Sequence, residues 1–382
     1  MAKRLPSAPP ILPGLDYVRP LGSGGFADVF LYQQDMPRRS VAVKVLPSDV
    51  RDPELLRMFN AEADVLAHLS AHPSIVTVYQ AGISADGRPY IVMEYCPGSL
   101  AQRYRLERIP VDEVLAIGVR MAGALESAHR AGLIHRDIKP SNILTTSFGS
   151  PVLADFGISS SLARTPGGEM FAMSVPWSAP EVIAEQTTGS VASEVWSLGA
   201  TVYSLAAGHS PFERRSVDGS GQNSREQLRK RIARASYTPI PRADLPDALQ
   251  AVLARAMERD PRRRQPSAAA FGEELRSVQI EAGFAPSPME IPVDDWAPAS
   301  EPVDFADAAL RGPQRSRVAH DSRRRVESPS VTSFARDEDT DISGEALLSA
   351  GVRRMRYWIL GGAVAVVVAV AAVVAALLAG AV

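Results

Sequence analysis

The stretch HRDIKPSN, residues 135–142, gathers polar and charged side chains between apolar segments. Phosphoryl transfer requires a carboxylate that accepts the proton of the substrate hydroxyl, oxygen atoms that hold Mg²⁺, and positive charge against the phosphoryl group. Asp137 suits the role of base, Asn142 suits a hard-metal ligand, and Lys139 suits a contact with the γ-phosphate. The stretch therefore predicts a phosphoryl-transfer centre.

A second polar cluster, DFG at residues 155–157, follows a short apolar run. Asp155 would complete the oxygen ligands of a divalent metal together with Asn142. Lysine usage points to the same chemistry, because only four of the 41 basic residues are lysines and two of these are Lys44 and Lys139. Arginine replaces lysine freely on a surface, but less so where a compact point charge is needed.

Residues 21–29 read LGSGGFADV, a glycine-rich run in which the backbone can approach a phosphate closely because glycine lacks a Cβ. The next residues, FLY at 30–32, predict a strand and not a helix, which argues against a dinucleotide-binding loop. A glycine-rich turn over nucleotide phosphates fits better, and an ordinary glycine hairpin is the alternative. The candidate nucleotide-binding residues of this run are Leu21, Gly22, Ser23, Gly24, Gly25, Phe26, Ala27 and Val29.

Lys44 ends the apolar strand VAVK of residues 41–44. A lysine in a strand that otherwise faces a core needs a partner, because an unpaired buried ammonium group is costly. Glu62, in the helical stretch of residues 55–69, can supply that carboxylate while Lys44 meets the nucleotide phosphates. The alternative is a surface lysine at the end of a strand.

These motifs, with APE at residues 179–181, occur together in an order and spacing that one family shares. Over about residues 16–277 the sequence resembles the bacterial, eukaryotic-like (Hanks-type) serine/threonine protein kinases. The resemblance implies an α+β, bilobal fold, with an antiparallel sheet and one helix in the N-lobe and a mostly helical C-lobe. It also implies ATP, Mg²⁺ or Mn²⁺, and protein substrates with serine or threonine acceptors, which Lys139 favours over tyrosine.

The resemblance assigns further residues to the nucleotide site and to its support. The residues implied to surround adenine are Val29, Ala42, Met93 as gatekeeper, Glu94 and Cys96 in the hinge, and Leu144. Leu66, His135 and Phe156 are implied to form a stack of side chains behind the site. Glu181 is implied to form a structural ion pair with Arg264.

Two departures from the family pattern lie beside the catalytic loop. Residues 173–175 read MSV where GTP is usual, but Ser174 keeps a hydroxyl that can contact Asp137 and Lys139. Glu194 stands where an aspartate normally anchors the catalytic-loop backbone, and its extra methylene group is expected to loosen that loop.

Arg136 precedes the predicted base, and in this family such an arginine often pairs with a phosphorylated activation loop. Thr165 is our favoured site of autophosphorylation and Ser174 is a second candidate, although both could be plain polar loop residues. Hydroxyl residues between Ser328 and Thr340 could, when phosphorylated, dock a forkhead-associated domain. An unmodified linker is the alternative.

Composition limits the other possibilities. The chain has 382 residues, of which 46% are hydrophobic and 22% charged, and these values argue against wholesale disorder. A net charge of −2 argues against a dedicated nucleic-acid binder. The single cysteine excludes an intramolecular disulfide framework.

We divide the chain into four parts. These are an N-terminal tail (1–15), a kinase domain (16–277), a disordered juxtamembrane linker (278–356) and a transmembrane helix with a short tail (357–382). The linker is rich in proline and charged residues and has few apolar clusters, so it buries too little surface to offset the entropy of ordering.

Residues 359–379 contain no polar side chain and are long enough to cross a bilayer as a helix. Arg353, Arg354 and Arg356 precede them, which predicts an N-in, C-out, single-pass protein of the plasma membrane with a cytoplasmic kinase domain. Small residues in this helix allow a homodimer. A buried core helix or an apolar tail is the alternative.

Two other function classes remain to be compared with an active kinase. A membrane-anchored pseudokinase that serves as a scaffold would lack a base or metal residue, whereas Asp137, Asn142 and Asp155 are all present. A small-molecule phosphotransferase is disfavoured by Lys139 and by the APE segment, which build a platform for protein substrates.

Overall fold

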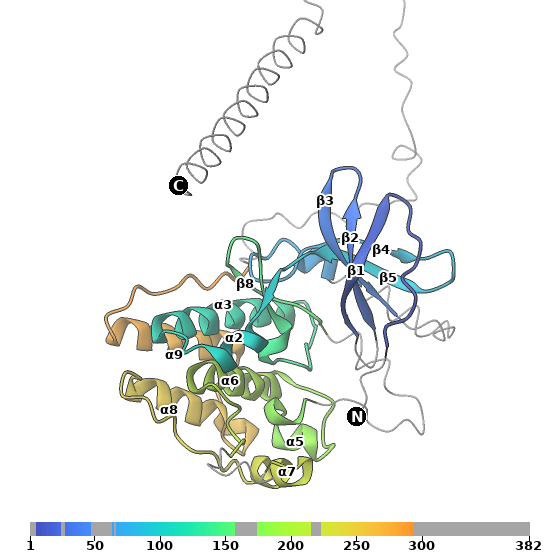
Figure 1. Cartoon of the computed structure of the whole chain (residues 1–382). Coiled ribbons are helices and arrows are strands. Elements are labelled where there is room, and N and C mark those ends of the chain that lie inside the picture. The colour runs from blue at the N-terminus through green and yellow to red at the C-terminus, as the bar shows by residue number, and fades with distance from the viewer. Residues whose placement is uncertain are drawn as a thin grey trace, which may run out of the picture. The chain divides into compact units, whose positions relative to one another are not determined.

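The N-terminal lobe is a five-stranded antiparallel sheet in the order β1-β2-β3-β5-β4 (Figure 1). The computed structural model describes residues 5–23, 27–46, 63–64, 66–156, 174–214 and 223–292, all within the compact unit Met1–Ser300. The strands are β1 (Leu15–Ser23), β2 (Asp28–Gln34), β3 (Arg39–Val45), β4 (Val78–Ile83) and β5 (Pro89–Glu94).

Side-chain alternation along β3 decides what faces the site. Val41 and Val43 pack with Phe30, Tyr32 and other residues in a cluster on one face of the sheet. Successive side chains of a strand point to opposite faces, so the intervening Ala42 belongs to the other hydrophobic cluster, on the side of the C-terminal lobe. The period of two thus directs Ala42, and Lys44 after it, toward the interlobe cleft.

The residues before β1 pack against this sheet. Leu12 is buried, and the Tyr32 hydroxyl donates a 2.6 Å hydrogen bond to the carbonyl of Pro10. The Ser7 hydroxyl donates to Asp28 over 2.7 Å. From Ser7 onward, the segment that we named an N-terminal tail (1–15) thus contacts the sheet.

The C-terminal lobe is built mainly from helices. They are α2 (Leu100–Leu106), α3 (Val111–Arg130), α5 (Pro180–Ile183), α6 (Val191–Ala207), α7 (Arg225–Ala233), α8 (Asp247–Ala256) and α9 (Ala268–Glu281). The short strands β6 (Gly98–Ser99), β7 (Ile143–Thr145) and β8 (Pro151–Leu153) and the 3₁₀ turns η1 (Pro140–Asn142), η2 (Val175–Trp177) and η3 (Pro261–Arg263) complete it. The antiparallel sheet and the helical lobe confirm the predicted bilobal architecture.

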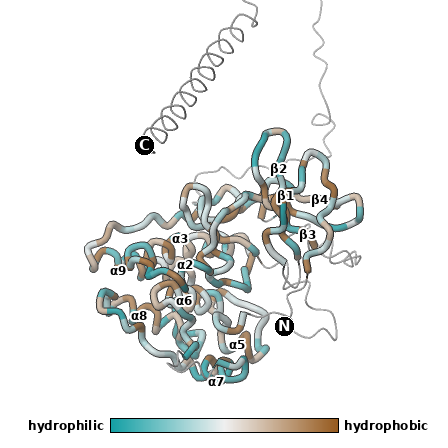
Figure 2. Tube along the Cα trace, viewed as in Figure 1, coloured by the Kyte–Doolittle hydropathy of each residue, from teal (hydrophilic) through white to brown (hydrophobic). Residues whose placement is uncertain are grey.

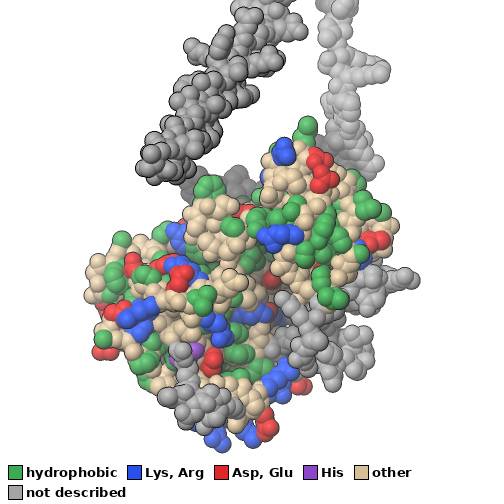
Figure 3. Space-filling view, in the orientation of Figure 1, with side chains coloured by type: hydrophobic (Ala, Val, Ile, Leu, Met, Phe, Trp, Pro, Cys, Tyr) green, Lys and Arg blue, Asp and Glu red, His purple; other side chains and the backbone are tan. Residues whose placement is uncertain are grey.

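Helix α6 is the centre of this lobe, since its side chains are buried around most of its circumference. Ser190 begins it with a capping box, and Gly208 ends it in a left-handed conformation with φ of 78°. Trp196 stacks on Phe212 with 5.6 Å between ring centroids. By contrast, α7 is hydrophilic over most of its length (Figure 2), and charged side chains of both signs are interspersed on the face shown in Figure 3.

The structured region continues beyond the predicted boundary at residue 277. Helix α9 runs to Glu281, and residues 284–292 pack against α3 and α9. The predicted linker (278–356) therefore begins with ordered chain, because the apolar side chains of Phe284 and Met289 find the domain core. Residues 293–356 lie outside the described part.

The predicted transmembrane segment, residues 357–382, also lies outside the described part of the chain. Among the helices that the structure describes, none is long and apolar enough to cross a membrane.

Candidate active site

Lys44 and Asp155 meet in the cleft between the lobes. The ammonium group of Lys44, 7% exposed, donates a 3.0 Å hydrogen bond to Asp155 Oδ1. The positive charge of Lys44 lowers the pKa of Asp155, although partial burial opposes this effect. Glu62, the predicted partner of Lys44, lies outside the described residues, so that ion pair stays a prediction.

The catalytic loop places three predicted residues side by side. Lys139 Nζ donates to Asp137 Oδ2 over 2.6 Å, and Asn142 Nδ2 donates to the same Oδ2 over 3.1 Å and to the carbonyl of Asp137 over 2.8 Å. The turn η1, with Pro140 in its first position, brings Asn142 back toward Asp137. These bonds fix the carboxylate of Asp137 at the mouth of the cleft, 36% exposed, where a hydroxyl group could reach it.

Ser174 lies on the far side of Lys139. Lys139 Nζ donates a 2.7 Å hydrogen bond to Ser174 Oγ, which confirms the predicted contact between these two residues. Lys139 therefore links the carboxylate of Asp137 to the first described residue after the 157–173 gap. Thr165, the favoured autophosphorylation site, falls in that gap and outside the described residues.

The carboxylate of Glu194, in α6, accepts a hydrogen bond from the backbone of the catalytic loop. Its Oε1 accepts a 2.6 Å hydrogen bond from the backbone N–H of Arg136, and its Oε2 accepts a 2.7 Å bond from His129 Nε2. Arg136 adopts a left-handed conformation with φ of 67°, so the loop needs such support. With this longer side chain the bond to the loop backbone is formed, and His129 is a second partner that was not predicted.

The donor set suits a divalent metal. Asn142 contributes an amide oxygen and Asp155 a carboxylate that is 46% exposed, and oxygen ligands of this kind hold Mg²⁺ and Mn²⁺. The described residues contain no group of three or more histidine, cysteine, aspartate or glutamate side chains suited to a metal. Any metal here would thus be held by these two residues together with nucleotide phosphates.

The predicted adenine-binding side chains belong to one hydrophobic cluster. Ala42 pairs with Met93 across β3 and β5, and both are buried. The partly buried predicted residues packed on the same cluster are Leu21, Val29, Cys96 and Leu144, and Ala27 lies within it. Gly22 and Ser23 end β1, Glu94 ends β5, and Gly24, Gly25 and Phe26 lie outside the described residues.

A small cavity of about 20 Å³ lies behind Lys44. Leu66 and Phe156 line it, and His135 packs on Phe156 with 4.6 Å between ring centroids. The predicted stack of Leu66, His135 and Phe156 is thus assembled. The other lining residues include Val76, Val78 and Ile91, which the sequence analysis missed although Ile91 is the cross-strand partner of Lys44.

Burial raises the pKa of the Cys96 thiol to about 12, and the nearby charge of Glu94 acts in the same direction. A thiol with such a pKa stays protonated near neutral pH, so Cys96 is a weak nucleophile. Its side chain packs against the hydrophobic cluster, and its place in the adenine hinge stays a prediction.

The predicted ion pair between Glu181 and Arg264 is confirmed. Arg264 donates two hydrogen bonds to the carboxylate of Glu181, over 2.6 Å and 2.8 Å, and its guanidinium lies 4.9 Å from the ring centroid of Trp196. Arg264 is almost fully buried. A bidentate pair of this kind ties the segment after Ser174 to the helical core.

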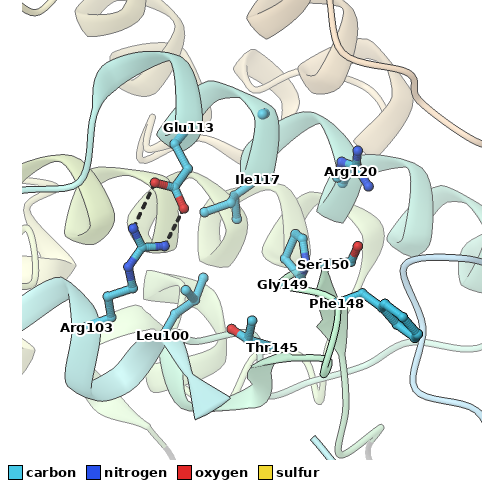
Figure 4. Close-up of a pocket in the computed structure, with 11 residues that line it drawn as sticks. Leu100, Arg103, Glu113, Ile117, Arg120, Thr145, Phe148, Gly149 and Ser150 are labelled. Atoms are coloured by element: carbon cyan, nitrogen blue, oxygen red, sulfur yellow. Dashed lines mark hydrogen bonds and ion pairs between the residues drawn. The ribbon is translucent and has the colours of Figure 1, made fainter. Parts of the chain in front are cut away.

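A larger hollow of about 190 Å³ lies away from the catalytic residues, between α2, α3 and the turn that joins β7 to β8 (Figure 4). Arg103 of α2 and Glu113 of α3 are ion-paired at its edge, and Phe148 stands at its rim almost fully exposed. None of the predicted catalytic or nucleotide-binding residues lines this hollow.

Comparison with known proteins agrees with the geometry. Residues 15–274 match the protein kinase domain family. The chain is 42% identical over 291 residues to the serine/threonine-protein kinase PknK of Mycobacterium bovis, covering 74% of this chain and 25% of PknK. It is 33% identical over 325 residues to PknB of Mycolicibacterium smegmatis, covering 81% of this chain and 50% of PknB. The similarity therefore spans a quarter to a half of the length of these relatives.

Proposed function

Because the chain belongs to the protein kinase family, we propose that it transfers the γ-phosphate of ATP to serine and threonine hydroxyls of other proteins. The observation that carries this proposal is the pair of bonds from Lys139, one to Asp137 and one to Ser174. A carboxylate beside a fixed ammonium group suits proton acceptance from an alcohol while negative charge builds on the phosphoryl group.

The roles of the other residues follow from their positions. Lys44 would hold the nucleotide phosphates, and Asn142 and Asp155 would hold Mg²⁺ or Mn²⁺. The metal neutralises charge on the phosphates when it is bound. Asp137 orients the acceptor hydroxyl and accepts its proton, while Asn142 and Lys139 keep that carboxylate in place. Leu21, Ala42, Met93 and Leu144 would enclose adenine.

The assay for this function uses the purified full chain, radiolabelled ATP and a generic basic protein, with Mg²⁺ or Mn²⁺ supplied in separate reactions. The expected result is phosphate incorporation that is linear in time and lost in Asp137→Asn. A folded chain that binds ATP but labels no acceptor with either metal would support the pseudokinase alternative. Equal labelling by the wild type and Asp137→Asn would contradict the role of this carboxylate.

Autophosphorylation is part of the same proposal, with Thr165 as the favoured site. Arg136, next to the base, supports it because a phosphate group on the activation loop can pair with a guanidinium group. Mass spectrometry of the wild type beside Asp137→Asn tests it. Phosphate on Thr165 in the wild type alone is the expected result, and the same phosphate on both chains would contradict it.

We also propose that residues 359–379 tether the kinase to the plasma membrane, with the catalytic domain on the cytoplasmic side. The support is the uninterrupted apolar sequence and the arginines that precede it. In membrane fractions washed with alkaline carbonate, the full chain should remain in the pellet and a chain lacking residues 357–382 should not. A homodimer through this helix and a forkhead-associated partner for a phosphorylated linker remain part of this proposal.

A further inference from the structure

We infer that residues 284–292, here named the C-terminal strap, are a positioning element for the active site. The strap runs from the end of α9 back along α3 to the turn at residues 70–76 in the N-terminal lobe (Figure 1). That turn follows Leu66 and is hydrogen-bonded to the strand just before Asp155. The inference deepens the proposed kinase function and rests on it.

The strap starts at a tight reversal. Gly283 has φ of 77°, and the N–H of Phe284 donates a 2.8 Å bond to the carbonyl of Gln279, which closes α9. The side chain of Gln279, almost fully buried, then holds Ser287 through two bonds of 2.8 Å. The three prolines of the strap, Pro286, Pro288 and Pro292, restrict the backbone, so ordering this segment costs less entropy than ordering most sequences.

The strap packs closely against two glycines within helices, Gly123 and Gly272. A Cβ on Gly123 of α3 would stand 2.7 Å from the carbonyl oxygen of Glu290, and a Cβ on Gly272 of α9 would stand 2.5 Å from Met289 Sδ. Glycine weakens a helix by about 1 kcal/mol relative to alanine, so a glycine within a helix calls for a packing reason. Here the close approach of the strap supplies it.

Near its end, at Glu290, the strap contacts His72, which is 8% exposed. His72 Nδ1 accepts a 3.0 Å bond from the N–H of Ser74, so the ring proton lies on Nε2, which donates a 2.8 Å bond to the carbonyl of Glu290. Through this imidazole the main chain of the strap is joined to the main chain of the turn.

Hydrogen bonds join the turn at residues 70–76 to the strand that precedes Asp155. Leu153 of β8 donates a 2.9 Å bond to the carbonyl of Ser74 and accepts a 2.9 Å bond from the N–H of Val76. Leu153 stands two residues before Asp155, and Leu66 lines the same cavity as Lys44 and Asp155. Release of the strap would therefore loosen both the metal-binding aspartate and the hydrophobic support of the lysine.

The test is Gly123→Ala in the full chain. The three nearest atoms that the new Cβ would meet belong to Met289 and Glu290, so the substitution acts first on the strap, while alanine favours the helix. We expect a KM for ATP raised by about five-fold, because nucleotide positioning and not the fold is affected. Ser277→Ala, exposed on α9, is the matched control and should behave as the wild type.

A second pair of variants separates packing from folding. Met289→Asp should reproduce the effect, and Met289→Leu, which keeps the apolar side chain, should restore wild-type kinetics. Hydrogen exchange at residues 70–76 and 284–292 should accelerate in Gly123→Ala and Met289→Asp only. If exchange accelerates in the strap while exchange at 70–76 and the KM for ATP stay unchanged, the inference is overturned. Hydrogen exchange requires no turnover, so it tests the role of the strap even in an inactive chain. An inactive wild type would refute the proposed kinase function only.

Discussion

The carboxylate of Glu194 accepts a 2.6 Å hydrogen bond from the backbone N–H of Arg136, and this bond holds the residue just before the predicted base. The same carboxylate is bonded to His129 and is almost fully buried. One acidic side chain thus stabilises both the strained loop and the end of α3. Whether its extra methylene group loosens the loop stays a prediction, although the bond to the loop backbone is formed.

Removal of this anchor should cost stability. Glu194→Ala leaves a buried imidazole and a buried N–H without their acceptor, which is expected to lower the free energy of unfolding by about 3 kcal/mol and Tm by roughly 6–12 °C. Differential scanning fluorimetry measures the shift, with Glu226→Ala on the exposed face of α7 as control. Equal melting temperatures for the two variants would contradict the anchoring role.

The bond between Lys139 and Ser174 predicts a kinetic effect. Ser174→Ala removes the acceptor of that bond and should lower kcat by about ten-fold without changing Tm, because Lys139 loses one of its two fixed partners. Ser174→Thr keeps the hydroxyl group and should retain most of the activity. Steady-state kinetics with a peptide substrate measures both, and a Ser174→Ala enzyme with wild-type kcat would exclude this role.

The pair of Arg264 and Glu181 predicts that lysine cannot replace arginine. Arg264→Lys loses the bidentate geometry and the contact with Trp196 in a buried site, and is expected to destabilise the fold by about 2–3 kcal/mol. Arg262→Lys, two residues earlier and 89% exposed, is the matched control and should change stability by less than about 0.5 kcal/mol. Urea unfolding of both variants gives the comparison.

The pairing of Lys44 with Asp155 predicts a pH effect. Lys44 lowers the pKa of Asp155 in the folded chain, so the pair stabilises the fold above the unfolded pKa of that carboxyl and loses its effect as pH falls through the lowered, folded pKa. The stability difference between the wild type and Lys44→Met should therefore shrink as pH falls below about 4. Urea unfolding across this pH range measures it, and a difference independent of pH would contradict the coupling.

Cys96 should resist alkylation. With a thiol pKa of about 12, its reaction with iodoacetamide at pH 8 is expected to be far slower than that of a cysteine peptide and to accelerate when urea unfolds the chain. Intact-mass spectrometry over time measures the rate. Rapid labelling of the folded chain would show that the hinge thiol is neither buried nor protonated.

The sequence predicted the features that depend on motif and spacing. The catalytic loop follows from residue types that a phosphoryl-transfer site requires, whereas the place of Ala42 in the nucleotide site and the pair of Glu181 with Arg264 were implied by the family resemblance. Contacts that join distant segments without a motif were missed. His129 meets Glu194 from 65 residues away, and no local pattern marks that approach.

The prolines of the strap have two opposite effects on order. A proline-rich sequence predicts disorder because such chain buries little surface. The same residues also lower the entropy of the unfolded chain, so a few well-placed contacts suffice to order it. Met289 against Gly272 and Glu290 against His72 are such contacts. The contact between Ser7 and Asp28 likewise joins residues that are distant in sequence, and no local pattern marks it.

The close packing of the strap on Gly123 and Gly272 determines where a recombinant fragment should end. A fragment that stops at residue 274, where the family match ends, divides α9 and lacks the strap. Gly123, Gly272 and His72 then lose the residues that pack on them. By our inference, enzymology or inhibitor screening on so short a fragment would be carried out without the contact between the strap and His72. A fragment that ends at Pro292 retains α9 and the whole strap.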